Sequence, residues 1–146
     1  MVDVYEYPAK IDWLGERKYR IEFFSKGSEG KPKMDVATPP EFNGHAGIYS
    51  PEDLFVASIL SCYMATFISI SNKMKISIEK FTCEGKGILE RTEGGLMFTS
   101  VVLRPHIILR DKSEVDKALK ASTLAEENCL VAKSIKTKTH LEPKVE

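Results

Sequence analysis

The stretch SPEDLFVASILSCYMATFISISNK, residues 50–73, decides the fold of this 146-residue chain. Ser50 is a good helix N-cap, Pro51 suits the first helical position, and the acidic residues that follow favour the positive end of a helix dipole. The body is apolar on nearly every side and carries no charge from Leu54 to Ile70. Because a helix that is apolar all round is normally buried, we expect a long central helix covered by the rest of the protein.

A membrane span is the alternative interpretation of this stretch. The uncharged run is shorter than the roughly 20 apolar residues that normally cross a bilayer, and serine and threonine interrupt it. Small residues recur in it at helical spacing and would let another backbone approach closely: Ser58, Ser61, Ala65 and Ser69. The opening MVDVYEYPAKIDW lacks the charged start and apolar run of a signal peptide. We therefore expect a core helix in a cytoplasmic protein, with no membrane partner.

Strands are expected on both sides of the helix. Before it, residues 8–14 and 18–25 are rich in aromatic and β-branched types and flank the turn Gly15-Glu16, which predicts a hairpin. A loop over 26–33 and a short third strand near 33–37 follow. After it, residues 75–90 and 96–109 flank the turn sequence TEGG, and a shift of the apolar phase predicts a bulge near Glu79–Lys80.

The last third of the chain predicts a second helix, capped by Ser113 and running to about Asn128, with Cys129 just beyond it. A short turn, CLVAKSI, and a final strand, KTKTHLEP, complete the pattern. With no repeat, linker or low-complexity segment, residues 1–146 are expected to form a single α+β domain in the order βββ-α-ββ-α-β.

Composition excludes several classes of function. Lys plus Arg equals Asp plus Glu at 21 each, so the chain offers no broad basic field for nucleic acid and no polybasic anchor for a membrane. Three histidines are scattered without ligand spacing and no C-x-x-C motif occurs, so we expect no metal site. No cofactor is expected either.

Three cysteines could carry chemistry: Cys62 within the helix, Cys83 on a strand and Cys129 after the second helix. Each alone is more often a small core residue, and a thiol in apolar surroundings has a raised pKa and does not react. For Cys62 to be a nucleophile, it needs a fixed cation nearby. Arginine suits best because it stays charged when partly desolvated.

Two segments together resemble the OsmC/Ohr family of osmotically inducible and organic hydroperoxide resistance proteins. They are TPPEFNGHAGIYSPEDLFVASILSC, residues 38–62, and AEENC, residues 125–129. The family pattern is a Gly-rich loop, then Asn- or Ser-Pro-Glu opening a long apolar helix, with the first cysteine ten residues after the glutamate, as Glu52 and Cys62 are spaced here. A second cysteine follows an acidic helix end. Many relatives carry proline directly after it, whereas this chain has Leu130.

The resemblance implies a thiol peroxidase that reduces organic hydroperoxides. The Cys62 thiolate would attack the peroxide and become a sulfenic acid, Cys129 would condense with it to a disulfide, and an external dithiol would reduce that disulfide. In the family, an arginine of the N-terminal hairpin orients the peroxide, and the Pro-Glu glutamate holds that arginine. The glutamate maps to Glu52; Arg17 is the best match for the arginine, with Arg20 as the alternative.

The resemblance also implies an OsmC-like fold, with antiparallel sheets around a long buried helix, and an intertwined homodimer whose active sites lie at the interface. A two-fold partner would help to bury the apolar helix. Apolar neighbours of Cys62 in the sequence would favour a hydrophobic organic peroxide over hydrogen peroxide.

Two other functions remain open at this stage. The same fold could form a non-catalytic dimer that binds a hydrophobic small molecule, with incidental cysteines. A stress-associated structural dimer without a ligand would explain neither the paired thiols nor Glu52. Reactivity toward a thiol probe separates the peroxidase from the non-catalytic binding dimer, because an activated thiolate at Cys62 should react faster than Cys83.

Overall fold

The computed structural model describes residues 3–146. The chain divides into two compact units, one ending at Leu54 and the other spanning Phe55–Glu146. The boundary lies in the first turn of the long helix α1, Pro51–Lys73. Each unit is described by itself.

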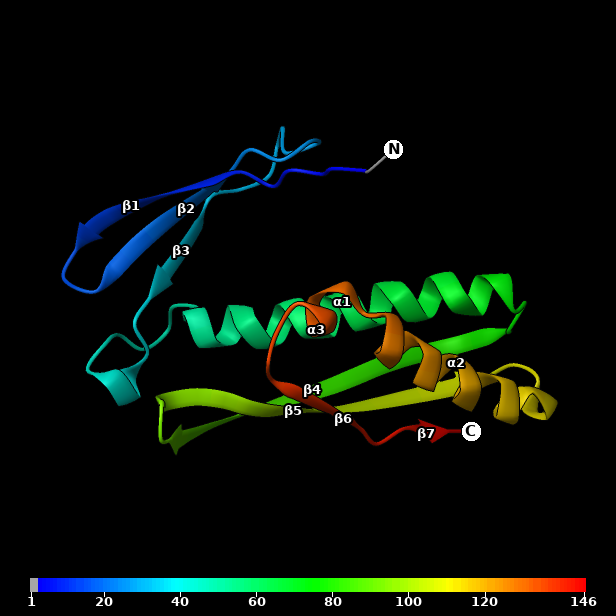
Figure 1. Ribbon diagram of the computed structural model, residues 1–146. Coiled ribbons are helices and arrows are strands. Elements are labelled where there is room, and N and C mark those ends of the chain that lie inside the picture. The colour runs from blue at the N-terminus through cyan, green and yellow to red at the C-terminus, as the bar shows by residue number, and fades with distance from the viewer. Residues whose placement is uncertain (1–2) are drawn as a thin grey trace. The chain divides into compact units, whose positions relative to one another are not determined.

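The N-terminal unit is a three-stranded antiparallel sheet in the order β1-β2-β3 (Figure 1). Its strands are β1 Ala9–Gly15, β2 Lys18–Phe23 and β3 Met34–Ala37, followed by the short 3₁₀ helix η1 Pro40–Phe42. The predicted hairpin, its turn and the third strand are confirmed. Gly15 and Glu16 have φ of 107° and 51°, the left-handed region that glycine adopts without strain and that makes this turn tight.

The start of α1 follows the predicted capping. The Ser50 hydroxyl accepts the Asp53 N–H at 3.1 Å, and the Ser50 N–H donates to the Asp53 carboxylate at 2.9 Å. Two amides at the helix start are thereby satisfied reciprocally, as in a capping box. The predicted N-cap at Ser50 is confirmed.

The C-terminal unit places α1 and α2 on one side of a mixed sheet (Figure 1). Its elements after α1 are β4 Ile78–Thr92, β5 Gly95–Leu109, the 3₁₀ helix η2 Lys112–Glu114, α2 Val115–Asn128, α3 Leu130–Lys133, β6 Lys138–Leu141 and β7 Lys144–Val145. β4 and β5 form the long antiparallel hairpin that was predicted. The final strand is divided into β6 and β7, and both pair with β5 in parallel, which the sequence did not predict.

Two local expectations have different outcomes. The predicted bulge is confirmed by a register shift between Ile78 and Lys80. The predicted cap at Ser113 is wrong, because the Asp111 carboxylate accepts the Ser113 N–H at 2.9 Å and starts η2, with α2 beginning only at Val115. Aspartate is an equally strong cap, and the chain uses the earlier residue.

The core forms where one face of α1 meets the sheet and α2. The buried residues of α1 recur every fourth position, and they pack with alternate residues of β5 and with small residues of α2. They are Ile59, Tyr63, Phe67 and Ser71 on α1; Val101, Leu103, Ile107 and Leu109 on β5; and Ala118, Ala121 and Ala125 on α2. The three alanines let α2 approach closely.

The expectation that α1 is buried all round is wrong for the single chain. Only 22% of its most apolar 18-residue window is buried, because one sheet and one helix cover one face and leave the others open. That window has a mean hydropathy of 1.9, so by length and composition α1 could cross a membrane, a test that core helices of soluble proteins also pass. Within the C-terminal unit, the sheet and α2 therefore cover only part of the surface of α1.

Two glycines on β4 allow α1 to lie close to the sheet. A Cβ at Gly85 would come within 2.8 Å of the Leu60 Cγ, and one at Gly87 within 2.7 Å of a Val56 methyl group. Atoms this close must move apart, so any side chain here pushes the helix away from the sheet.

We expect Gly85→Ala to destabilise the protein by about 1–3 kcal/mol, the range for an extra methyl group forced into a packed interior. Gly94→Ala is the matched control, because its new Cβ would have only the Thr92 hydroxyl nearby, at 3.8 Å. Urea-unfolding midpoints measure both. Equal midpoints for the two variants would show that α1 can shift without cost.

Candidate active site

Cys62 and Cys129 come together from different elements of the C-terminal unit. Cys62 lies on the flank of α1 and is partly exposed, and Cys129 is 1% exposed. Cys129 ends α2 and starts α3, with an extended conformation of φ −65° and ψ 116° that turns the chain between the two helices. The two thiols are within hydrogen-bonding reach of each other, and both are free. The fold therefore joins residues that are far apart in the sequence.

The pKa of the Cys62 thiol lies below its ordinary value. Burial is the largest single influence and raises it, but hydrogen bonds to the sulfur together outweigh burial. They come from the Val131 N–H, the Cys129 thiol and the Leu130 N–H, with the Thr66 hydroxyl as the weakest. Thr66 has one proton, which it already donates to the Cys62 carbonyl at 2.8 Å. The two amides and the neighbouring thiol are therefore the effective donors.

The pKa of Cys129 is shifted in the opposite direction. Burial raises it most, and the adjacent Cys62 sulfur raises it further, against hydrogen bonds from the Ala132 and Val131 amides. Two close thiols cannot both ionise easily, so the first proton lost belongs to the pair. The geometry favours charge on Cys62, with Cys129 keeping its proton and donating it to Cys62.

Cys83 has a different environment on β4. Its thiol points at the Glu84 carbonyl at 3.6 Å, and burial raises its pKa to about 11. Such a thiol is almost entirely protonated at neutral pH and reacts poorly. Cys83 belongs to the apolar packing around α1.

A groove of about 540 Å³ opens beside Cys62. Its α1 wall consists of residues at helical spacing, and its other wall comes from α2 and the residue after Cys129. The lining residues are Cys62, Ala65, Thr66, Ser69, Ile70 and Lys73, then Leu124, Asn128 and Leu130. At 1.5 Å per residue, the α1 wall extends for about 16 Å from the thiol. The groove is mostly apolar and has room for an extended organic molecule.

Glu52 lies in the first turn of α1, as the sequence predicted. One of its carboxylate oxygens is buried and has no hydrogen-bond partner among residues 3–146. A buried carboxylate without a partner is costly. A cation is therefore the expected partner of Glu52, in line with the arginine that the resemblance assigns to it.

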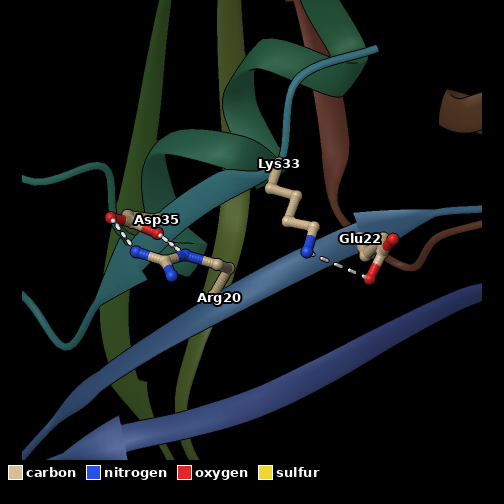
Figure 2. A network of polar contacts seen from close by, with 4 residues as sticks. All are labelled: Arg20, Glu22, Lys33 and Asp35. Atoms are coloured by element: carbon tan, nitrogen blue, oxygen red, sulfur yellow. Dashed lines mark hydrogen bonds and ion pairs between the residues drawn. The ribbon is translucent and has the colours of Figure 1, made fainter. Parts of the chain in front are cut away.

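The two candidate arginines are engaged differently within the N-terminal unit. Arg20 on β2 forms a two-pronged pair with Asp35 on β3, at 2.7 and 3.2 Å, next to the Lys33–Glu22 pair at 3.7 Å (Figure 2). Arg17, in the hairpin turn, donates one N–H to the Phe42 carbonyl at 2.9 Å, which leaves its other donors available for a carboxylate. This difference favours Arg17. Its role at Cys62, like that of Glu52, stays a prediction.

Several contributors could not be predicted from the sequence. The amides of Leu130 and Val131 act through the main chain, which carries no residue-specific signal. The buried Tyr63 hydroxyl lies 2.8 Å from the Ser122 hydroxyl and ties α1 to α2, which sets where Cys129 lies. In the described part of the chain, no group of three or more His, Cys, Asp or Glu side chains gathers as metal ligands would.

Comparison with known proteins identifies the family. Residues 44–144 match the family model described as OsmC-like protein. The chain belongs to the OsmC-like family. A structure of an OsmC-like protein of unknown function from Vibrio cholerae, VCA0330, is 28% identical, with a TM-score of 0.84 over 96% of this chain and 99% of that one.

Two other relatives extend the likeness along the whole chain. An organic hydroperoxide resistance protein OsmC from Legionella pneumophila is 27% identical, with a TM-score of 0.77 over 99% of both chains. The uncharacterized protein YmaD of Bacillus subtilis is 25% identical over 145 residues, 97% of this chain and 93% of that protein. The α+β OsmC-like fold implied by the sequence is confirmed, and the OsmC-like family includes organic hydroperoxide resistance proteins.

We expect iodoacetamide to alkylate Cys62 well before Cys83 in the folded protein. At pH 8 a thiol with a pKa of about 11 is only about one part in a thousand thiolate, whereas the lowered pKa of Cys62 gives it a larger thiolate fraction than Cys83 has. Peptide mapping by mass spectrometry over a time course measures both rates, and the urea-unfolded protein is the control in which the rates converge. Equal rates in the folded state would contradict an activated Cys62.

Proposed function

We propose that this OsmC-like protein is a thiol-dependent peroxidase that reduces organic hydroperoxides to alcohols, with Cys62 as the reacting thiol. The observation that carries the proposal is the paired arrangement at Cys62: a sulfur with a lowered pKa, next to a protonated second thiol and an apolar groove. An activated thiolate, a resolving thiol and room for an organic substrate are the three requirements of this chemistry. Kinship with organic hydroperoxide resistance proteins supports it.

In the first step, the Cys62 thiolate attacks the outer oxygen of the hydroperoxide. The S–O bond forms as the O–O bond breaks, sulfur is oxidised to a sulfenic acid, and the departing alkoxide takes up a proton to become the alcohol. Arg17, held by Glu52, would orient the peroxide and favour the thiolate. The buried Glu52 oxygen without a partner in residues 3–146 supports such a cation.

In the second step, the Cys129 sulfur attacks the Cys62 sulfenic acid. An S–S bond forms, the S–O bond breaks and water leaves with the Cys129 proton. The two thiols are close enough to shift each other's pKa, so Cys129 is near the sulfenic acid when it forms. Because Cys129 is held beside Cys62, its attack is intramolecular and competes well with any thiol from solvent.

An external dithiol then restores the enzyme without a bound cofactor. One of its thiolates attacks Cys62, the more exposed sulfur of the disulfide, and Cys129 leaves as a thiolate that is then protonated. The second thiol of the reductant releases the product disulfide. A cytoplasmic location, where such thiols are kept reduced, is part of the proposal.

The proposed active form is a homodimer. The residues of α1 that face solvent in the single chain include Ser58, Ser61, Ala65 and Ser69, the small-residue stripe that the sequence singled out. The partly apolar α1 face around them is mostly uncovered. A second copy placed on this stripe would bury apolar surface, and small side chains would permit close contact between backbones.

We expect one equivalent of an alkyl hydroperoxide to remove two free thiols, with peptide mapping showing a Cys62–Cys129 disulfide. Cys62→Ser should abolish steady-state turnover, and Cys129→Ser should complete one turnover and stall as a sulfenic acid that a dimedone probe captures. Cys83→Ser is the matched control and should keep full activity. Full turnover by Cys62→Ser would rule the mechanism out. No thiol loss in the wild type would instead favour a dimer that binds a hydrophobic small molecule in the groove.

We expect the wild-type protein to sediment at twice its 16.4-kDa chain mass. Ala65→Arg, in the middle of the small-residue stripe, should shift it toward monomer, because a long charged side chain would enter a desolvated contact. Thr123→Arg, an exposed position on α2, is the control. A monomeric wild type at working concentration, or an unaffected Ala65→Arg dimer, would show that α1 is not the contact.

A further inference from the structure

The groove beside Cys62 has few polar side chains that could bind a peroxide. Its polar lining residues other than the thiol are Thr66, Ser69, Lys73 and Asn128. Ser69 and Lys73 lie farther along α1, about 10 and 16 Å from Cys62 at 1.5 Å per residue. Thr66 is close, but it donates its only proton to the Cys62 carbonyl at 2.8 Å. Asn128 is therefore the lining side chain that could donate a hydrogen bond near the thiol.

The position of Asn128 follows from the end of α2. Asn128 is the last residue of that helix and directly precedes Cys129. Its side-chain amide donates one N–H to the Leu124 carbonyl at 2.8 Å, one turn earlier in the helix, and both residues line the groove. Neighbouring Cα atoms are about 3.8 Å apart, and Cys129 lies beside Cys62. The Asn128 amide is thus held at the groove wall, at the end that contains the thiol.

One donor of this amide remains available. A carboxamide has two N–H donors. The Leu124 carbonyl takes one of them, and the Asn128 side chain has no other hydrogen bond within residues 3–146. Asn128 is exposed, so water can reach the second N–H and a substrate oxygen can replace that water. A capping role at the end of α2 uses only the first N–H and leaves the second free for a ligand.

We propose that Asn128 is a catalytic residue that donates its free N–H to the departing oxygen of the hydroperoxide. The inference deepens the proposed peroxidase function, on which it rests, because it names the group that meets the charge formed in the first step. It concerns the C-terminal unit alone and is independent of the role proposed for Arg17.

The chemistry of the first step needs a donor at this oxygen. As the Cys62 thiolate forms the S–O bond, the O–O bond breaks and its electron pair passes to the oxygen that carries the organic group. Negative charge thus moves from sulfur to an alkoxide, a poor leaving group that then takes a proton from water. A donor fixed where charge develops stabilises the transition state without reorganisation. The amide keeps its own proton, so Asn128 is unchanged after each turnover.

The test compares two oxidants with different leaving groups. tert-Butyl hydroperoxide releases an alkoxide, whereas peracetic acid releases acetate, a stable anion that needs little help from a donor. Reduced full-length protein is mixed with each oxidant at neutral pH, and the loss of the Cys62 thiol is followed by rapid quenching, alkylation and peptide mapping. We expect Asn128→Ala to slow the reaction with the alkyl hydroperoxide by about ten- to a hundredfold, the effect of losing one hydrogen bond to a charged group. The reaction with peracetic acid should change much less.

Asn72→Ala is the matched control, because it makes the same substitution in the last turn of α1 and outside the groove. It should leave both rates unchanged. Alanine is a better helix former than asparagine, so Asn128→Ala is expected to fold. The ratio of the two rates also cancels any loss of folded protein or of thiolate, since both oxidants react with the same Cys62 sulfur.

An unchanged rate ratio in Asn128→Ala would overturn the proposal, whether the two rates stay at their wild-type values or fall together. A merely structural role of Asn128 at the end of α2 predicts that second result. A wild type that does not react with the alkyl hydroperoxide would contradict the proposed function, and this inference with it, before any variant is made. The two failures are therefore distinguishable.

Discussion

The packing of one face of α1 on the β4–β5 sheet is the interaction on which the rest of this protein depends. Ile59, Tyr63 and Phe67 are completely buried there, and they fix the rotation of α1 about its axis. With that rotation fixed, Cys62 faces the flank on which α2 ends. The glycines of β4 permit the close approach, since any side chain at Gly85 would collide with Leu60.

The Tyr63–Ser122 contact links this packing to the chemistry. A buried hydroxyl pair at 2.8 Å holds α1 and α2 in one relative position, because leaving either hydroxyl without a partner in the core would be costly. Cys129 directly follows the end of α2, so no loop has to rearrange to bring its sulfur near Cys62. Residues that never touch a substrate therefore decide the distance between the two thiols.

The environment then gives the two thiols different properties. Both are desolvated, which disfavours ionisation, but hydrogen bonds converge on Cys62 more effectively than on Cys129. Cys83 has fewer such donors, and burial, its largest influence, raises its pKa to about 11. Cys62 differs from Cys83 both in burial and in the number of hydrogen bonds to its sulfur.

Local features of this fold could be predicted from sequence because local chemistry specifies them. The Ser50 cap, the Gly15-Glu16 turn and the bulge near Lys80 each depend on neighbours within a few residues. The parallel pairing of β6 and β7 with β5 is a long-range choice that no local pattern encodes. The Asp111 cap was missed because two residues near one another could both start the helix.

The candidate site also combines features that the sequence could predict with features that it could not. The pairing of Cys62 with Cys129 came from resemblance to a family, and the structure adds the contact between the sulfurs. The donors to Cys62 are amides, which any residue but proline supplies, so no side-chain pattern could reveal them. One-sided burial of α1 was also beyond the sequence, because a helix that is apolar all round looks the same whether one chain or two cover it.

The arrangement at the thiols also bears on how the proposed disulfide would be reopened. Reactivity alone would make Cys62 the better leaving group, since its thiolate is the more stable of the two. Solvent access favours the opposite outcome, attack at Cys62 with Cys129 as the leaving group. Cys129 is 1% exposed, so an incoming dithiol can reach only Cys62. Access takes precedence, since an unreachable sulfur cannot be attacked at all. Cys129 must then leave as the thiolate, and the Val131 and Ala132 amides directed at it ease that step.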